Sequence, residues 1–247
     1  MTAARRTLAR AVYEAGTLVG RSPAIALAVA GWRGHGVPVG EDTDMAIEGY
    51  PRSANSFAVA AFAVAQPESV RIAHHTHSPA NVIAAVRRGI PALVLIREPE
   101  DAVVELVLLK PALTVGQALR GWVRFYRPLL PFRDRFVAAR TEEVLSDLAA
   151  VIARVNERFG TSFAAFDPTE ESVAAVRGAA GGYWEGRTGR GLPLVGRTQG
   201  TEEGRDAERE RLHVAFRAPD LERGRRRAAR LHETFTSGLP GPVGGRG

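Results

Sequence analysis

Short apolar runs alternate with segments of helical periodicity between residues 44 and 139. Three runs predict strands, at residues 45–49, 69–74 and 91–97. The third is a continuous apolar run up to Arg97, which is typical of a strand buried on both faces. A helix is predicted after each strand, over residues 56–66, 79–89 and 99–109. Strand, loop and helix repeated in this order imply a parallel sheet with right-handed crossovers.

The rest of the chain adds mainly helices. Residues 114–132 read as helical, 135–139 as a strand and 142–159 as one long amphipathic helix. Residues 178–205 are rich in Gly and Arg and predict a loop, whereas 207–235 predict a charged helical segment. We therefore expect an α/β domain over residues 44–236, a helical extension and linker over 1–43, and a disordered tail over 237–247.

The N-terminal segment is amphipathic and is followed by a short apolar stretch. Glu14 and Arg21 interrupt the apolar pattern, which argues against an export signal. No stretch of the 247 residues is long and apolar enough to predict a membrane-spanning helix. We expect a cytoplasmic protein, with a weak membrane-surface contact of the N-terminal helix as a hypothesis.

Composition excludes several kinds of chemistry. The chain has no cysteine, so it can form neither a disulfide nor a cysteine-based zinc site. Its formal net charge of +6 comes almost entirely from arginine, since Lys110 is the one lysine. Arginines at helical spacing near the C-terminus (Arg223, Arg226, Arg227 and Arg230) favour a solvated helix face. No aromatic residues are interleaved with them, so we expect no nucleic-acid partner.

Polar side chains follow each of the first three predicted strands. The stretches are YPRSANS, HHTHSP and REPED. In open α/β sheets, ligands bind at the carboxyl ends of the strands. Three polar stretches at these positions therefore predict a binding site.

The first stretch partly matches the Walker A pattern, G-x-x-x-x-G-K-[ST]. Gly49 and Ser56 fit it, but Ala54 and Asn55 replace its second glycine and its lysine. A helix N-terminus is a ready anion site, and Arg52 adds a planar cation suited to phosphate or sulfate oxygens. The alternative is an ordinary helix cap at Ser53 or Asn55.

The other two stretches also carry candidate functional groups. His74, His75 and His77 could serve as base, metal ligands or structural residues. The local sequence offers no acidic partners at metal-ligand spacing, so we expect no metal. Arg97 ends the third strand, and the alternative for it is a surface ion pair with Glu98 or Asp101.

Taken together, these stretches resemble the sulfotransferase family, which uses 3′-phosphoadenosine 5′-phosphosulfate (PAPS). The family's Y-P-[KR]-S-G-[TN]-[TS]-[WF] loop is similar to residues 50–57, and its T-H-x-P pattern to residues 76–79. Its R-[DN]-P-x-D-x-x-x-S pattern resembles residues 97–105, with Glu105 in place of the serine.

The resemblance implies a three-layer P-loop-like fold with a central parallel sheet of four to five strands flanked by helices. It also implies sulfuryl transfer from PAPS, without a metal, to a hydroxyl or amine of a small-molecule, carbohydrate or lipid acceptor. His77 would be the catalytic base, and Arg52 would stabilise the transferring group. The residues implied to bind the donor are Arg52, Ser53, Ala54, Asn55, Ser56 and Arg97, with Arg197 and Gly200 as the best candidates in a late loop and Arg187 and Arg190 as the next ones.

Two departures from the family pattern keep alternatives open. Ala54 fits if its φ is negative. Glu105 would repel a 3′-phosphate unless it turns away or pairs with an arginine. A P-loop kinase-like phosphotransferase is one alternative, and Asn55 argues against it. A non-catalytic sulfotransferase-fold protein is the other, suggested by Glu105.

Aromatic side chains in the later part of the chain are candidates for an acceptor pocket, although a plain core role is favoured for them. These residues are Trp122, Phe125, Tyr126, Tyr183 and Trp184. The sequence does not predict an oligomeric state.

Overall fold

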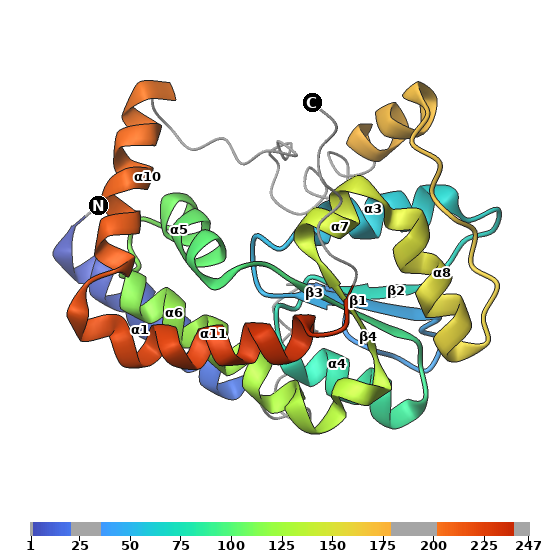
Figure 1. Ribbon diagram of the computed structural model, residues 1–247, viewed down its shortest axis with the longest axis horizontal. Coiled ribbons are helices and arrows are strands. Elements are labelled where there is room, and N and C mark those ends of the chain that lie inside the picture. Colours follow the sequence, from blue (N-terminus) through green and yellow to red (C-terminus); the bar gives the residue numbers. More distant parts are fainter. Residues whose placement is uncertain (1, 21–35, 179–201, 240–247) are drawn as a thin grey trace.

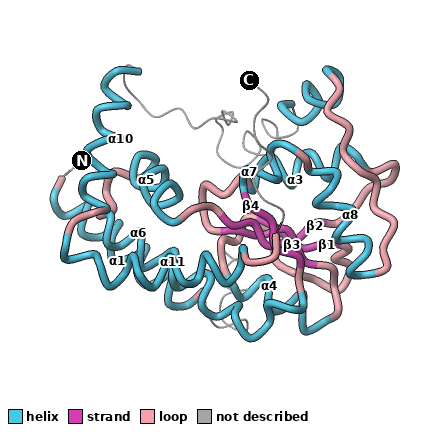
Figure 2. The backbone as a smooth tube through the Cα atoms, in the orientation of Figure 1, coloured by secondary structure: helices cyan, strands magenta, loops and turns pink. Residues whose placement is uncertain are grey.

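The computed structural model describes residues 2–20, 36–178 and 202–239. Four parallel strands form one sheet in the order β2-β1-β3-β4, with helices on both sides of it (Figures 1 and 2). The strands are β1 (Met45–Gly49), β2 (Ile72–His74), β3 (Ala92–Ile96) and β4 (Val137–Arg140). The predicted α/β fold with a parallel sheet is confirmed.

The helices follow the strands in the predicted alternation. They are α1 (Ala3–Val19), α3 (Asn55–Ala65), α4 (Pro79–Arg88), α5 (Pro99–Leu109), α6 (Val115–Tyr126), α7 (Thr141–Ser146), α8 (Leu148–Phe159), α10 (Glu202–Phe216) and α11 (Glu222–Thr236). Two 3₁₀ segments, η1 (Arg127–Arg135) and η2 (Pro219–Leu221), join them, and residues 170–178 are also helical.

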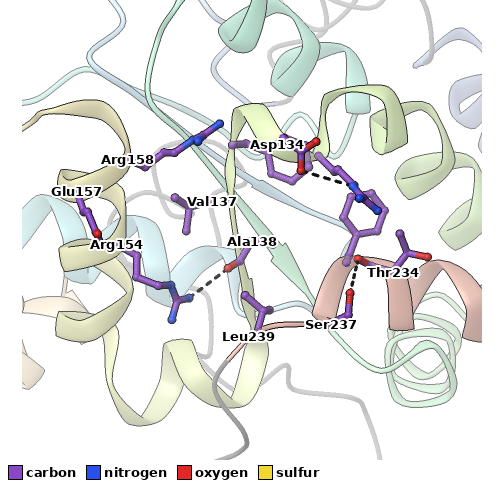
Figure 3. A pocket seen from close by; sticks show the side chains of 12 residues that line it. Asp134, Val137, Ala138, Arg154, Glu157, Arg158, Thr234, Ser237 and Leu239 are labelled. Carbon is purple, nitrogen blue, oxygen red and sulfur yellow. Dashed lines mark hydrogen bonds and ion pairs between the residues drawn. The ribbon is translucent and has the colours of Figure 1, made fainter.

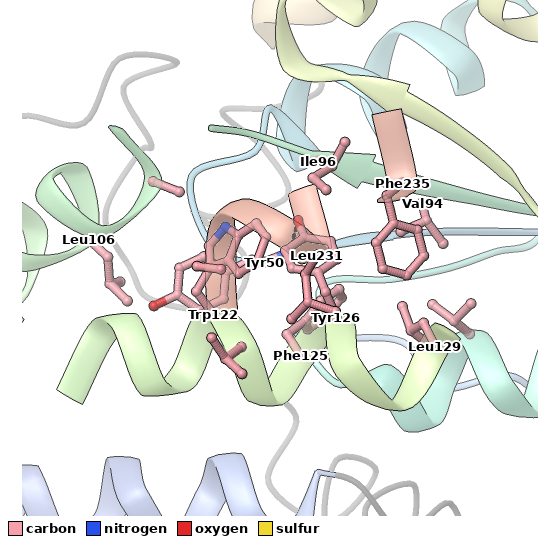
Figure 4. Packing of buried hydrophobic residues seen from close by; sticks show 14 of the residues in the cluster. Tyr50, Val94, Ile96, Leu106, Trp122, Phe125, Tyr126, Leu129, Leu231 and Phe235 are labelled. Atoms are coloured by element: carbon pink, nitrogen blue, oxygen red, sulfur yellow. Dashed lines mark hydrogen bonds between the residues drawn. The ribbon is translucent and has the colours of Figure 1, made fainter. Parts of the chain in front are cut away.

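Two apolar clusters pack on the two faces of the sheet. Successive strand residues point to opposite faces, so β3 contributes Val94 and Ile96 to one cluster and Leu93 and Leu95 to the other. The first cluster joins the sheet to α4, α5, α6 and α11 (Figure 4). The second joins it to α3 and α8. Helix, sheet and helix therefore form three layers.

Three predicted helical segments are interrupted. Residues 142–159 form two helices because Asp147 leaves the helical conformation (φ −151°) and its side chain accepts from the N–H of Ala150 at the start of α8. Residues 207–235 are interrupted by η2 at Pro219. The segment 114–132 is α-helical only to Tyr126 and continues as η1, which contains Pro128 and Pro131.

Buried aromatic side chains fix the sheet against α6. The Tyr126 hydroxyl donates to the carbonyl of Leu95 on β3 (2.7 Å) and accepts from the N–H of Tyr50 (3.4 Å). Trp122, Phe125 and Tyr126 are buried in the core, as favoured from the sequence (Figure 4). Tyr183 and Trp184 lie outside the described residues.

Helix α1 packs on the side of α6 that faces away from this core (Figure 4). The Tyr13 hydroxyl lies 2.9 Å from that of Tyr50, and Glu14 forms ion pairs with Arg120 and Arg124. The part of the predicted extension that the structure describes is thus bonded to the α/β body, and the domain boundaries stay a prediction.

Candidate functional site

The strand register places the three polar stretches at one edge of the sheet. Ile47 of β1 lies opposite His74, the last residue of β2, and Gly49 lies opposite Leu95 of β3. A Cβ atom on Gly49 would lie 2.8 Å from the Leu95 carbonyl oxygen, so the close approach requires glycine here. Because the strands are parallel, the loops after all three leave from the same edge.

The loop after β1 leads into a helix with an open N-terminus. Ala54 is the N-cap of α3 and offers no side-chain hydrogen bond. The backbone N–H groups of Asn55, Ser56 and Phe57 donate to no described residue. Such groups, together with the helix dipole, form an anion site.

Neither predicted cap residue closes this helix. Ser53 is fully buried, and the Asn55 amide nitrogen donates to the carbonyl of Tyr50 (3.1 Å). By contrast, Ser78 caps α4 and Glu98 caps α5 through their side chains. The alternative of an ordinary cap at Ser53 or Asn55 is therefore wrong.

Ala54 has a left-handed backbone. Its φ is +61°, so the condition under which alanine fits without strain, a negative φ, is not met. An L-residue in this region costs about 1–2 kcal/mol through contact of its Cβ atom with the backbone. Arg52, two residues earlier, also has a positive φ (+75°). The loop is therefore held in a strained shape by its surroundings.

The arginines of the site are linked to one another through Glu105. Arg52 Nη2 lies 3.3 Å from Glu105 Oε2, and Arg209 of α10 lies 3.1 Å from Oε1. Arg97 Nη1 donates to the backbone carbonyl of Arg52 (3.1 Å). Glu105 thus pairs with arginine, which is one of the two conditions under which a carboxylate could lie close to a bound 3′-phosphate.

Two buried guanidinium nitrogens at this site have no partner. Arg52 Nε and Arg97 Nε are inaccessible to solvent and make no hydrogen bond with a described residue. Buried donors are nearly always satisfied in folded proteins. Together with the open first turn of α3, they form a set of donors that suits an anionic ligand.

His77 is fixed in one tautomer by the end of β1. Its Nδ1 atom lies 3.0 Å from the carbonyl oxygen of Gly49, which can only accept. Nδ1 therefore carries the hydrogen, and Nε2 bears the lone pair of the neutral ring.

The other two histidines link the second loop to the first. His74 Nδ1 lies 2.7 Å from His75 Nδ1, and His75 Nε2 lies 3.0 Å from the Ser56 hydroxyl. This chain of hydrogen bonds connects β2 to the first turn of α3. It orients the Ser56 side chain beside the open helix N-terminus.

Glu48 anchors the histidine loop from inside β1. Its carboxylate is fully buried and accepts four hydrogen bonds. The Thr76 N–H and hydroxyl donate to Oε1 (2.8 and 2.6 Å), Asn81 Nδ2 also donates to Oε1 (3.0 Å), and the His77 N–H donates to Oε2 (3.2 Å). Burial raises the pKa of Glu48 from 4.5 to about 7, against the lowering effect of these hydrogen bonds.

Several of these partners were not predicted. Glu48 is a carboxylate in an otherwise apolar strand, which was a usable signal, whereas Arg209 is one of many arginines in a charged helix. Arg197 and Gly200, with Arg187 and Arg190, lie outside the described residues.

Two hollows on the described surface lie apart from these side chains. One, of about 620 Å³, lies beside the start of β4 between α8 and the end of α11 (Figure 3). The other, of about 750 Å³, lies between α6 and α11. Neither is lined by Arg52, His77 or Arg97. Among the described residues, no group of three or more His, Asp or Glu side chains is arranged to hold a metal ion.

Replacing Ala54 with glycine should relieve the strained loop. We expect Ala54→Gly to raise the free energy of unfolding by about 1 kcal/mol, because glycine adopts this φ without steric cost. Gly89→Ala is the matched control, since Gly89 has φ +73° and open space for a Cβ atom. It should lower the free energy of unfolding by a similar amount. Urea unfolding measures both, and a destabilised Ala54→Gly variant would contradict the strain.

Replacing Glu48 with glutamine should change how stability depends on pH. The folded protein holds the Glu48 proton more tightly than the unfolded chain does, so its contribution to stability falls as pH rises from 4.5 to about 7. Glutamine at position 48 has no group that titrates in this pH range. The stability of Glu48→Gln relative to the parent should therefore rise across that window, by up to about 3 kcal/mol.

Urea unfolding at several pH values measures this difference. Glu157→Gln, at an exposed position of α8, is the matched substitution. A difference between Glu48→Gln and the parent that stays constant with pH would show that Glu48 does not titrate in this way.

Comparison with known proteins adds little evidence about the function of the chain. No family model matches the chain, and no curated protein matches it. Among solved structures, mouse sulfotransferase SULT7A1 complexed with PAP is similar at 13% sequence identity and a TM-score of 0.41, over 79% of this chain and 91% of that chain. A likeness this weak supports no conclusion by itself, so the functional assignment depends on the side chains at the sheet edge.

Proposed function

We propose that this protein is a sulfotransferase that moves a sulfuryl group from PAPS to a hydroxyl or amine. The observation that carries the proposal is a set of hydrogen-bond donors without partners among the described residues, gathered at one edge of the sheet. It consists of the open first turn of α3, Arg52 Nε and Arg97 Nε. The sequence pattern of the three loops supplies the chemical identity of the ligand.

The loop after β1 would hold the sulfuryl donor, PAPS, at its 5′ end. The N–H groups of residues 54–57 and the Ser56 hydroxyl would bind the phosphosulfate, and Arg52 would bind the transferring group. Ser53 and Asn55 are buried, so they would act by keeping the loop in shape. Arg97, with Arg197 and Gly200 of the late loop, would bind the 3′-phosphate.

His77 would act as the general base. The acceptor oxygen or nitrogen forms a bond to sulfur as the bond between sulfur and the bridging phosphate oxygen breaks. The acceptor proton passes to His77 Nε2, the nitrogen that bears the lone pair. Arg52 and the α3 N–H groups would stabilise the negative charge that develops on the leaving phosphate.

Glu48 would serve as a positioning residue. It binds the backbone N–H of His77, while the Gly49 carbonyl binds the imidazole. Both His75 (φ +57°) and His77 (φ +49°) have left-handed backbones, which these contacts help to maintain. The base is therefore held at both its backbone and its ring, as preorganised catalysis requires.

The structure gives one reason to disfavour a P-loop kinase-like phosphotransferase. Such an enzyme needs a cation at the position of Asn55 to reach the β- and γ-phosphates. Asn55 is buried, and its amide is used to bind Tyr50.

A non-catalytic protein of the same fold is the second candidate. It is favoured by the ion pair between Arg52 and Glu105, because the proposed catalytic cation is engaged by a carboxylate of the chain itself. Transfer of labelled sulfate from PAPS to a panel of small-molecule, carbohydrate and lipid acceptors separates the two candidates. Transfer to any acceptor establishes the enzyme.

Replacing His77 should abolish turnover while leaving donor binding intact. We expect His77→Ala to lower kcat by about 10²–10⁴-fold, the usual contribution of a general base. Affinity for adenosine 3′,5′-bisphosphate should change little, because the role proposed for the imidazole is to take the proton of the acceptor. His232→Ala in α11 is the control and should keep kcat. Unchanged kcat in His77→Ala would remove His77 from the mechanism.

A further inference from the structure

Helix α1 turns several polar side chains toward the α/β body and leaves apolar side chains exposed on another face. The side chains of Glu14 and Thr17 are bonded to Arg124 of α6, and the Arg10 side chain donates to the carbonyl of Ala112 in the turn before α6. Leu8, Val12 and Val19 recur at helical spacing on the other face and are 65%, 50% and 37% exposed. Ala4, Ala11 and Ala15 are also exposed between them. An exposed apolar stripe of this kind marks an interaction surface.

An arginine-rich groove adjoins this stripe. The groove between α6 and α11 is lined by Arg120, Arg124, Arg127, Arg223, Arg227 and Arg230, and among the described lining residues only Asp220 is acidic. Leu18 of α1 lines the groove and is 48% exposed, so the end of α1 forms part of its wall.

Most of the positive charge in the groove is not neutralised. Arg120 and Arg124 are paired with Glu14. The side chains of Arg127, Arg223, Arg227 and Arg230 make no ion pair or hydrogen bond with a described residue. Like charges gathered in a concave surface repel one another and attract an anionic partner.

We propose that α1 and this groove together bind an anionic phospholipid surface. An apolar helix face buries itself at the headgroup boundary, and neighbouring arginines bind the negatively charged headgroups. A soluble polyanion would use the groove and leave the apolar stripe in water, whereas a membrane surface uses both. Among the described residues no helix could span a membrane, and this contact requires none.

The contact is independent of the proposed transfer reaction. Its residues lie on α1, α6 and α11, and none belongs to the three loops at the sheet edge. Failure of sulfuryl transfer would therefore leave the membrane contact untouched, and loss of the membrane contact would leave transfer to a soluble acceptor untouched.

Co-sedimentation of the full chain with vesicles tests the proposal. We expect binding to equimolar phosphatidylcholine–phosphatidylglycerol vesicles and at least about tenfold weaker binding to pure phosphatidylcholine, since each arginine near an anionic surface contributes about fivefold. Two sets of changes at exposed positions should each weaken binding by about tenfold or more. They are Leu8→Gln with Val12→Gln, and Arg223→Gln with Arg227→Gln and Arg230→Gln.

The matched control removes the same charge elsewhere. Arg88→Gln, Arg133→Gln and Arg158→Gln lie at exposed positions outside the groove and should leave vesicle binding within about twofold of the parent. If the groove variant and this control variant, each with three arginines replaced, lost equal vesicle affinity, the attraction would be non-specific and the proposal would be overturned. Unchanged binding in the Leu8→Gln, Val12→Gln variant, or binding to inorganic polyphosphate without binding to vesicles, would also overturn it.

Discussion

A single buried carboxylate holds the proposed site together. Glu48 stands at the end of the central strand β1 and binds the loop after β2 through both oxygens. Those hydrogen bonds help to offset the cost of left-handed backbones at His75 and His77, about 1–3 kcal/mol each. A separate hydrogen bond joins His77 Nδ1 to the Gly49 carbonyl oxygen. Without a buried acceptor at this position, the backbone N–H groups of Thr76 and His77 would lose the partner that they have in the structure.

A second set of contacts ties the first loop to the far end of the chain. Glu105 on α5 bridges Arg52 and Arg209, and Arg209 belongs to α10 near the C-terminus. One Nη atom of Arg52 binds Glu105, whereas its buried Nε atom makes no hydrogen bond with a described residue. The ion pair therefore leaves part of the hydrogen-bonding capacity of Arg52 unused. The pair also lowers the repulsion that a lone carboxylate would exert on a phosphate.

The sequence predicted the elements better than the contacts between them. Apolar runs located β1, β3 and the helices after them. A parallel strand that is buried on both faces has a nearly continuous apolar sequence, which can be recognised directly. The break at Asp147 was missed, since the helical periodicity continues across it while the local cap decides the structure. The positive φ of Ala54 could not be read from residue type, because alanine adopts it only when tertiary contacts impose it. The pairing of Glu105 with Arg209 joins residues 104 positions apart and has no local signal.

Calorimetric titration with adenosine 3′,5′-bisphosphate tests the central claim most directly. The proposed function predicts saturable binding to the parent protein and a loss of about tenfold or more in Arg97→Gln, because a hydrogen-bonded charge pair is worth about 1.5–3 kcal/mol. Arg88→Gln, at the exposed end of α4, should bind like the parent. The absence of both binding heat and a thermal shift in the parent protein would contradict donor binding, and with it the assignment as a sulfotransferase.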